Sequence, residues 1–169
     1  QRAWTWEHQA RVRARGIAGD AGLQQRFEEI RASVLSRPRN EDALRRDVSS
    51  MRARMRAELD RSDAARFDVK QGDGGLVDLE FLLQYVVLRD ACRFPGLLRP
   101  RDTLGLLDAA CREGILSAAA CPALREAHAV LLEAGLRCTL DRRPRLLPET
   151  AEIKAAREAI ASAREDNGL

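Results

Sequence analysis

The chain has 169 residues, of which 45% are hydrophobic and 33% charged, and its formal net charge is only +3. Seven aromatic residues and few β-branched ones exclude a protein built mainly from sheets. No apolar run approaches the roughly 18 residues of a membrane-spanning helix, and no signal peptide is visible, so we expect a cytoplasmic, all-α domain.

The first part of the chain predicts three helices. The first covers residues 1–15 and ends at Gly16 and Gly19. The second follows Asp20 as its N-cap and runs to about residue 36, and the third follows Asn40 and runs to residue 59. Apolar stripes at helical spacing consist of Leu23, Phe27, Ile30 and Val34 in the second helix, and of Leu44, Val48, Met51, Met55 and Leu59 in the third.

Residues 61–75 interrupt the helical pattern with a polar connector, a short extended piece at 67–69 and three glycines. The fourth helix, about 76–93, is apolar nearly all round, which is typical of the central helix of a bundle. Three more helices follow, with N-caps at Asp102 or Thr103, at Ser117 and at Thr150. The sequence therefore predicts a helical bundle of about six or seven helices.

The cysteines and histidines do not suggest a metal site. The four cysteines are Cys92, Cys111, Cys121 and Cys138. They have no Cys-x-x-Cys spacing, and neither histidine completes a ligand set with them. Each lies in an apolar helical context, so we expect reduced, buried thiols. We expect His128 to be a hydrogen-bonded core residue, because it follows the inward stripe of the sixth helix.

The glycines Gly72, Gly74 and Gly75 lead directly into the fourth helix. A helix N-terminus offers unpaired N–H groups that can bind phosphate. The spacing nevertheless fits neither the Walker pattern nor the dinucleotide fingerprint. It favours a tight turn with close backbone packing over a ligand loop.

Asp78 and Glu80 form an acidic pair at the start of the same helix. On a strand they would share a face and could bind Mg²⁺, but on a helix they point about 200° apart. The sequence therefore predicts no metal site here, and favours stabilisation of the helix dipole by the acids. A carboxylate beside so apolar a helix needs a partner, and we expect Lys70 or an arginine of the first helix.

Arginine supplies 27 of the 29 basic residues. The clusters comprise Arg11, Arg13 and Arg15; Arg45, Arg46, Arg52, Arg54 and Arg56; and Arg142, Arg143 and Arg145. A nucleic-acid-binding bundle using these faces is one alternative. Because acidic residues interleave with the arginines and few aromatics accompany them, solvated helix faces are the favoured interpretation.

Two segments carry a family resemblance. Residues 3–10 read Ala-Trp-Thr-Trp-Glu-His-Gln-Ala and continue into the Arg11–Arg15 segment. Residues 67–81 contain Phe-Asp-Val-Lys and Gly-Gly-Leu-Val-Asp-Leu-Glu-Phe, followed by Gln84 and Tyr85. Both resemble the bifunctional glutamine synthetase adenylyltransferase/adenylyl-removing enzymes. The likeness covers roughly residues 2–140 and is weak beyond Pro148.

The resemblance implies that the chain is a fragment of a bifunctional enzyme. That family has two nucleotidyltransferase domains, each followed by a helical domain. One half transfers AMP from ATP to a tyrosine of glutamine synthetase with Mg²⁺, and the other removes it by phosphorolysis. The chain resembles the carboxy-terminal helical domain, with residues 1–18 as a helix after the catalytic domain, 19–148 as the bundle and 149–169 as a C-terminal helix and tail. The missing Met agrees with a fragment.

The resemblance also implies partners and a site. The expected partners are the upstream nucleotidyltransferase domain, glutamine synthetase and the PII signalling protein, and neither a membrane nor nucleic acid is expected. Catalytic carboxylates belong to the upstream domain, so this segment alone is expected to be inactive, with ATP and Mg²⁺ bound by the parent enzyme. Residues expected to face the nucleotide cleft are Lys70, Gly74, Gly75, Asp78, Glu80, Arg11 and Arg13.

This assignment leads to one mutational expectation and leaves one alternative. In the full-length enzyme, Asp78→Asn is expected to lower adenylylation far more than thermal stability. The alternative to the cleft is a scaffold that binds regulators without contacting nucleotide, in which the glycines and acids serve packing alone.

Overall fold

The computed structural model describes residues 4–169, so Ala3 of the first family segment and the start of the predicted first helix lie outside the described residues. Seven α-helices, one 3₁₀ helix and two very short strands make up the described chain. They are α1 (Thr5–Val12), α2 (Ala21–Leu35), α3 (Glu41–Leu59), β1 (Phe67–Asp68), α4 (Leu76–Asp90), η1 (Pro95–Leu98), α5 (Thr103–Arg112), α6 (Ala120–Leu140), β2 (Leu146–Leu147) and α7 (Ala151–Asp166). The predicted all-α bundle is confirmed.

Helix α4 is the centre of the bundle. It packs against α1, α3, α5, α6 and α7, and Leu79, Leu82, Tyr85 and Val86 along it are fully buried. An apolar surface on every side requires neighbours on every side, as the sequence predicts. The segments before and after α4 are therefore held close to the core.

Four of the predicted N-caps are confirmed by hydrogen bonds from the backbone amide of the third residue after the cap. Asp20 accepts from Leu23 at 3.1 Å, and Asn40 accepts from Ala43 at 2.8 Å. The caps Asp102 and Thr150 accept from Gly105 at 2.8 Å and from Ile153 at 3.3 Å. These local signals fix where four of the helices begin.

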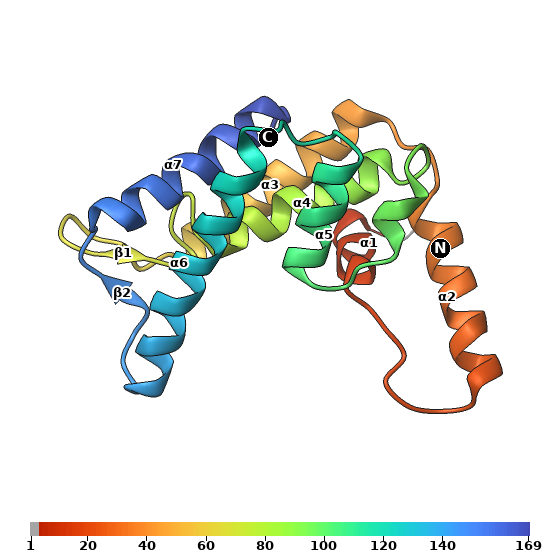
Figure 1. Ribbon diagram of the computed structural model, residues 1–169, viewed down its shortest axis with the longest axis horizontal. Coiled ribbons are helices and arrows are strands. Elements are labelled where there is room, and N and C mark those ends of the chain that lie inside the picture. The colour runs from red at the N-terminus through yellow and green to blue at the C-terminus, as the bar shows by residue number, and fades with distance from the viewer. Residues whose placement is uncertain (1–3) are drawn as a thin grey trace.

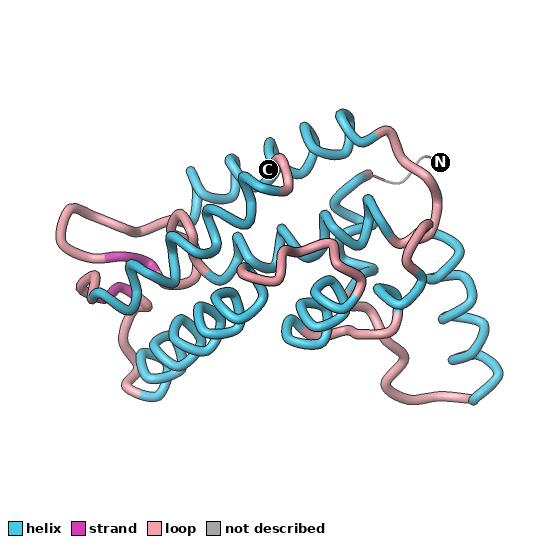
Figure 2. The backbone as a smooth tube through the Cα atoms, turned by 45° about the horizontal axis from the view of Figure 1, so that its top comes forward, coloured by secondary structure: helices cyan, strands magenta, loops and turns pink. Residues whose placement is uncertain are grey.

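The strands and α2 lie at opposite ends of the molecule, and α6 and α7 run side by side (Figures 1 and 2). Strands β1 and β2 are antiparallel, with Phe67 opposite Leu147 and Asp68 opposite Leu146. This small ribbon joins the connector before α4 to the loop between α6 and α7. No helix among residues 4–169 is both long and apolar enough to cross a membrane.

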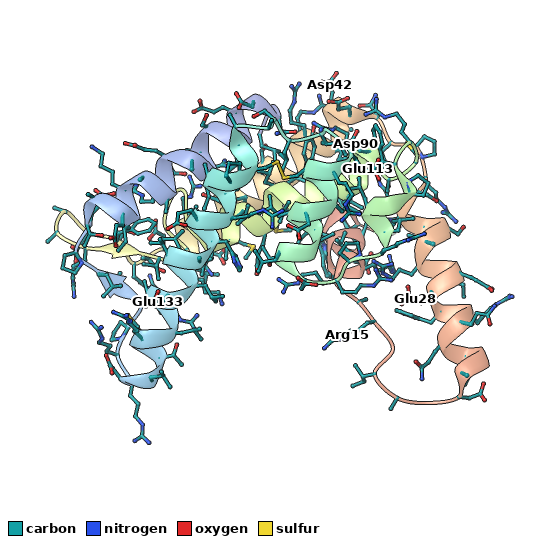
Figure 3. The ribbon with its side chains drawn as sticks, in the orientation of Figure 1. Arg15, Glu28, Asp42, Asp90, Glu113 and Glu133 are labelled. Atoms are coloured by element: carbon teal, nitrogen blue, oxygen red, sulfur yellow. A yellow bond between two sulfur atoms is a disulfide. The ribbon has the colours of Figure 1, made fainter. Side chains whose placement is uncertain are left out.

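The predicted first helix is too long. Helix α1 ends at Val12, and the chain then runs through an exposed connection to Asp20. Figure 3 shows Arg15 on this connection, away from the helices. The glycines at 16 and 19 therefore lie in the connection and do not end the helix.

The apolar stripe of α2 does not face the core. Leu23, Phe27 and Ile30 are 71%, 40% and 55% exposed. The buried face instead carries Leu35 and Arg31, whose guanidinium donates to the carbonyl oxygens of Arg11, Val12 and Leu98. Three backbone carbonyls compensate the buried charge of Arg31. The helix therefore turns Arg31 toward the core and its apolar stripe toward solvent.

Three of the four cysteines differ from the expectation of reduced, buried thiols. Cys111 at the end of α5 and Cys121 at the start of α6 form a disulfide, visible as a yellow bond in Figure 3. Cys92 is exposed, and only Cys138 is a buried free thiol. The turn between α5 and α6 brings the two bonded Cα atoms within 6.0 Å, which the spacing of ten residues does not reveal.

Candidate functional site

The glycine-rich segment before α4 is a closed turn whose three glycine amides are already hydrogen-bonded. Gly72 donates to the carbonyl of Asp68 at 2.8 Å, and Gly75 donates to that of Gly72 at 2.9 Å. The first amides of α4, on residues 76 and 77, donate to carbonyls of residues 69 and 70, each at 3.1 Å. A phosphate would have to displace these bonds, so the segment differs from a phosphate-binding loop.

Close packing explains why this turn is rich in glycine. A Cβ atom on Gly72 would lie 2.2 Å from the ring of Phe67. Gly74 has a φ of +78°, and a Cβ there would lie 2.7 Å from the backbone of Arg157 in α7. A side chain at Gly75 would meet backbone oxygens at about 3 Å. The geometry agrees with the predicted tight turn.

Asp78 lies at the centre of a buried ionic cluster. It has no exposed surface, and its carboxylate accepts from Arg52 at 2.6 Å, from Arg56 at 2.8 Å and from Arg164 at 3.3 Å. The amide of Gly74 donates to it as well, at 2.7 Å. The carboxylate therefore ties the glycine turn to α3 and α7.

This cluster corrects two expectations. The partners of Asp78 come from α3 and α7, not from Lys70 or the first helix. Arg52, expected on a solvated face, is only 3% exposed. Its guanidinium also donates to the carbonyl of Gln71 at 2.7 Å, so two of its three nitrogens have hydrogen-bond partners in the interior.

Glu80 faces a different side of α4. Its carboxylate accepts a hydrogen bond from Arg13, just past the end of α1, at 2.7 Å, and both side chains are about two-fifths exposed. An arginine of the N-terminal segment is thus its partner, as predicted. The two acids serve different neighbours, and the carboxylate of Asp78 is occupied by arginines, so the pair does not suit Mg²⁺.

Two adjoining cavities of about 350 and 190 Å³ share Leu76, Glu80 and Leu132 in their walls. We call them together the α4–α6 groove. Its charged and titratable lining consists of Arg13, Lys70, Glu80, Asp102, His128 and Arg145. Lys70 is exposed, and its ammonium makes no ion pair with any described residue.

The groove brings together three of the seven predicted cleft residues, Arg13, Lys70 and Glu80. Gly74, Gly75 and Asp78 are buried and do not line the groove. Arg11 is partly buried, and its carbonyl accepts from Arg31 at 2.9 Å. Sequence reasoning missed the place of Arg145 in the groove, because this residue follows a helix that ends more than fifty positions after Glu80.

His128 is a groove residue that the sequence placed in the core. It is half-buried, and its ring has no hydrogen-bond partner among the described side chains. Burial lowers its pKa below the ordinary 6.5, and the nearby charge of Glu80 opposes that shift. At neutral pH the ring is therefore uncharged and free to donate or accept one hydrogen bond.

A larger cavity, about 680 Å³, lies between α1 and α3 and is separate from the groove. Its polar groups are already paired. Thr5 donates to Asp47 at 2.6 Å, and Arg39 lies 3.0 Å from the Nδ1 atom of His8. The groove has the unpaired charge, so it is the better candidate for binding a charged ligand.

Comparison with known proteins gives the family. The model of the GlnD PII-uridylyltransferase family matches residues 43–167, about three quarters of the chain, including α4 and the groove wall on α6. The chain belongs to this family. Within the match lie the glycine turn, the Asp78 cluster and the arginines of α3 that complete it.

Individual relatives in the comparison bear the name of the enzymes that the two sequence segments resemble. The chain is 59% identical over 163 residues to the bifunctional glutamine synthetase adenylyltransferase/adenylyl-removing enzyme of Stenotrophomonas maltophilia strain K279a, covering 96% of this chain and 18% of that protein. To the protein of the same name from Xanthomonas axonopodis pv. citri it is 55% identical over 168 residues, 99% of this chain and 18% of the relative. For Pseudomonas aeruginosa the identity is 43% over 84% of the chain and 16% of the relative.

The predicted resemblance is confirmed, and it extends further than predicted. An alignment over 168 residues includes nearly all of the segment after Pro148, where we expected weak likeness. The chain spans less than a fifth of the length of these curated relatives.

Proposed function

We propose that this chain is the carboxy-terminal helical domain of a glutamine synthetase adenylyltransferase and that the α4–α6 groove forms one wall of its adenylylation cleft. The observation that carries the proposal is the meeting of Arg13, Lys70 and Glu80 at one groove. These residues belong to the two segments that resemble the family. The names and identities of the relatives support the parent activity.

The charges of the groove suit the phosphates of ATP. Lys70 has an unpaired ammonium, and Arg13 is held only by a half-exposed ion pair with Glu80. Such an exposed pair contributes about 0–1 kcal/mol, so Arg13 can exchange a carboxylate for a phosphate at little cost. In this proposal Mg²⁺ is held by carboxylates of the catalytic domain, and this chain alone transfers no AMP.

Asp78, Gly74 and Gly75 serve as positioning residues in this proposal. The turn that they form places Lys70 at its start and α4, with Glu80, at its end. Gly74 donates to the carboxylate of Asp78, so the turn and the helix are fixed to each other. A change in any of the three would move Lys70 relative to Glu80.

The test uses the full-length enzyme with ATP, Mg²⁺ and glutamine synthetase. Lys70→Gln removes an exposed charge from the groove, so we expect the KM for ATP to rise about tenfold, as for loss of one hydrogen bond to a charged group, with no change in Tm. Arg26→Gln is the matched control, because it removes an exposed charge from α2, far from the groove. Equal kinetics for Lys70→Gln and wild type would reject the cleft wall.

A regulator-binding role is the second candidate, and two observations favour it. The family is named for an enzyme that acts on PII, and α2 exposes Leu23, Phe27 and Ile30. If α2 binds PII, Leu23→Ser should weaken PII binding to the full-length enzyme and leave the KM for ATP unchanged. Unchanged PII binding would exclude this face.

Nucleic-acid binding is less well supported. Among residues 4–169, ion pairs with Asp or Glu involve arginines from every long helix. Paired arginines leave no continuous basic stripe along these helices. Basic residues without an ion pair occur in several helices, but Arg61, Lys70, Arg142 and Arg145 line one common pocket.

A further inference from the structure

A basic pocket lies at the end of the molecule that carries the two strands. Its volume is about 480 Å³, and five basic side chains line it: Arg61, Lys70, Arg142, Arg143 and Arg145. They come from the connector before α4 and from the loop between α6 and β2. Residues more than seventy positions apart thus place like charges around one cavity. All five side chains are exposed, so water weakens their mutual repulsion, and a bound anion would weaken it further.

Few acidic groups balance these charges. Arg143 pairs with Asp141 at 3.1 Å. Asp68 also lines the pocket, but its carboxylate already accepts from the amides of Lys70 and Gln71, at 3.0 and 2.9 Å. Within the described chain, the only side-chain hydrogen bond from the four other basic groups runs from Arg145 to Thr139 at 3.3 Å. The pocket therefore keeps an excess of about three positive charges.

The backbone at Arg142 is a second, independent observation. This residue has a φ of +51°, the only positive φ among the non-glycine residues described. It follows the C-cap of α6: its amide donates to Thr139, and the amide of Arg143 donates to Cys138 at 2.9 Å. Glycine is the usual residue at this position of such a helix end, because a side chain is strained there. An arginine at this site lowers stability and adds charge to the pocket.

We propose that this pocket binds a small polyphosphate anion of the inorganic pyrophosphate or triphosphate class. Its volume suits a small molecule, and its excess charge matches a ligand that carries three or more negative charges. No aromatic side chain lines it, so the phosphates rather than a base would be recognised. The carbonyl end of α6 opposes an anion with about half a charge, which the four cations outweigh.

The site goes beyond the proposed cleft wall. It shares Lys70 and Arg145 with the α4–α6 groove, but Arg61 and Arg142 belong to the pocket alone. Binding to this chain involves no AMP transfer. The proposal can therefore fail while the cleft wall stands, and the reverse is equally possible.

The experiment is calorimetric titration of inorganic triphosphate into the 169-residue chain at low salt. We expect saturable 1:1 binding that weakens as salt rises and that is at least about tenfold tighter than sulfate binding at equal ionic strength. Arg61→Gln and Arg142→Gly should each weaken it by about threefold to tenfold. Arg26→Gln removes the same charge from α2 and should leave it unchanged.

Arg142→Gly separates binding from folding. Glycine relieves the strained backbone, so this variant should have a Tm equal to or above that of the wild type while it loses affinity. The proposal is overturned by any of three results: no saturable binding, equal affinity for sulfate and triphosphate, or equal loss in the Arg26→Gln control.

Discussion

The buried carboxylate of Asp78 gives the sharpest test of the structure. In Asp78→Asn the negative charge is lost, but Arg52 remains 3% exposed beside it. Removing one partner of a buried ion pair costs about 3–5 kcal/mol, because the other charge stays in the interior. For a chain of this length, 1 kcal/mol corresponds to about 2–4 °C in Tm. We therefore expect a fall of about 6–20 °C, a larger effect on stability than the sequence alone led us to expect.

The assay is thermal and urea unfolding followed by the helical circular dichroism signal. Glu80→Gln is the matched control, since it removes a carboxylate two positions away whose ion pair is half-exposed. That change should cost no more than about 1 kcal/mol. If Asp78→Asn is as stable as Glu80→Gln, the buried cluster does not hold α3, α4 and α7 together, and the reasoning is wrong.

Three further outcomes are expected of the isolated chain. Gly74→Ala should lower stability by about 1–3 kcal/mol, because its φ is +78° and α7 leaves no room for a Cβ atom. Gly135→Ala, where a Cβ atom would have contacts of 3.6 Å or more, should not lower it. The midpoints of urea unfolding of the two variants measure this difference. Burial lowers the folded-state pKa of His128, so the unfolded chain binds a proton on this ring more tightly and stability falls as pH drops below 6.5. His128→Asn should therefore reduce the loss of stability between pH 7.5 and 5.5, and an unchanged loss would count against that burial. Reduction of the Cys111–Cys121 disulfide should lower stability by about 2–3 kcal/mol, because it removes a constraint on the unfolded chain. The Tm of the Cys111→Ser variant should not respond to reductant.

The helices were predictable from the sequence because their signals are local. Asp20, Asn40 and Thr150 each bond an amide three residues ahead, so neighbouring residues contain the whole interaction. The central position of α4 was equally predictable, because an apolar surface on all sides needs no knowledge of which helices cover it. In both cases the physical cause and the sequence pattern occupy the same segment.

The orientation of α2 shows where local reasoning fails. The stripe of Leu23, Phe27 and Ile30 has helical spacing, yet the buried face is set by Arg31. Its three backbone acceptors include Leu98, far along the chain, and nothing in α2 itself identifies these carbonyls. A hydrophobic pattern predicts that a helix is amphipathic, but not which neighbours are present to cover its apolar side.

The glycine turn combines both situations, and this explains why the candidate site was predicted only in part. Its tight backbone follows from the glycines themselves, and the opposite orientation of Asp78 and Glu80 follows from helix geometry. The partners do not follow, since the arginines that bury Asp78 come from α3 and α7. Once those partners are known, the turn divides into a buried side that fixes the backbone and an open side that carries Lys70 and Glu80. On the open side Glu80 pairs with Arg13, whereas the ammonium of Lys70 pairs with no described carboxylate.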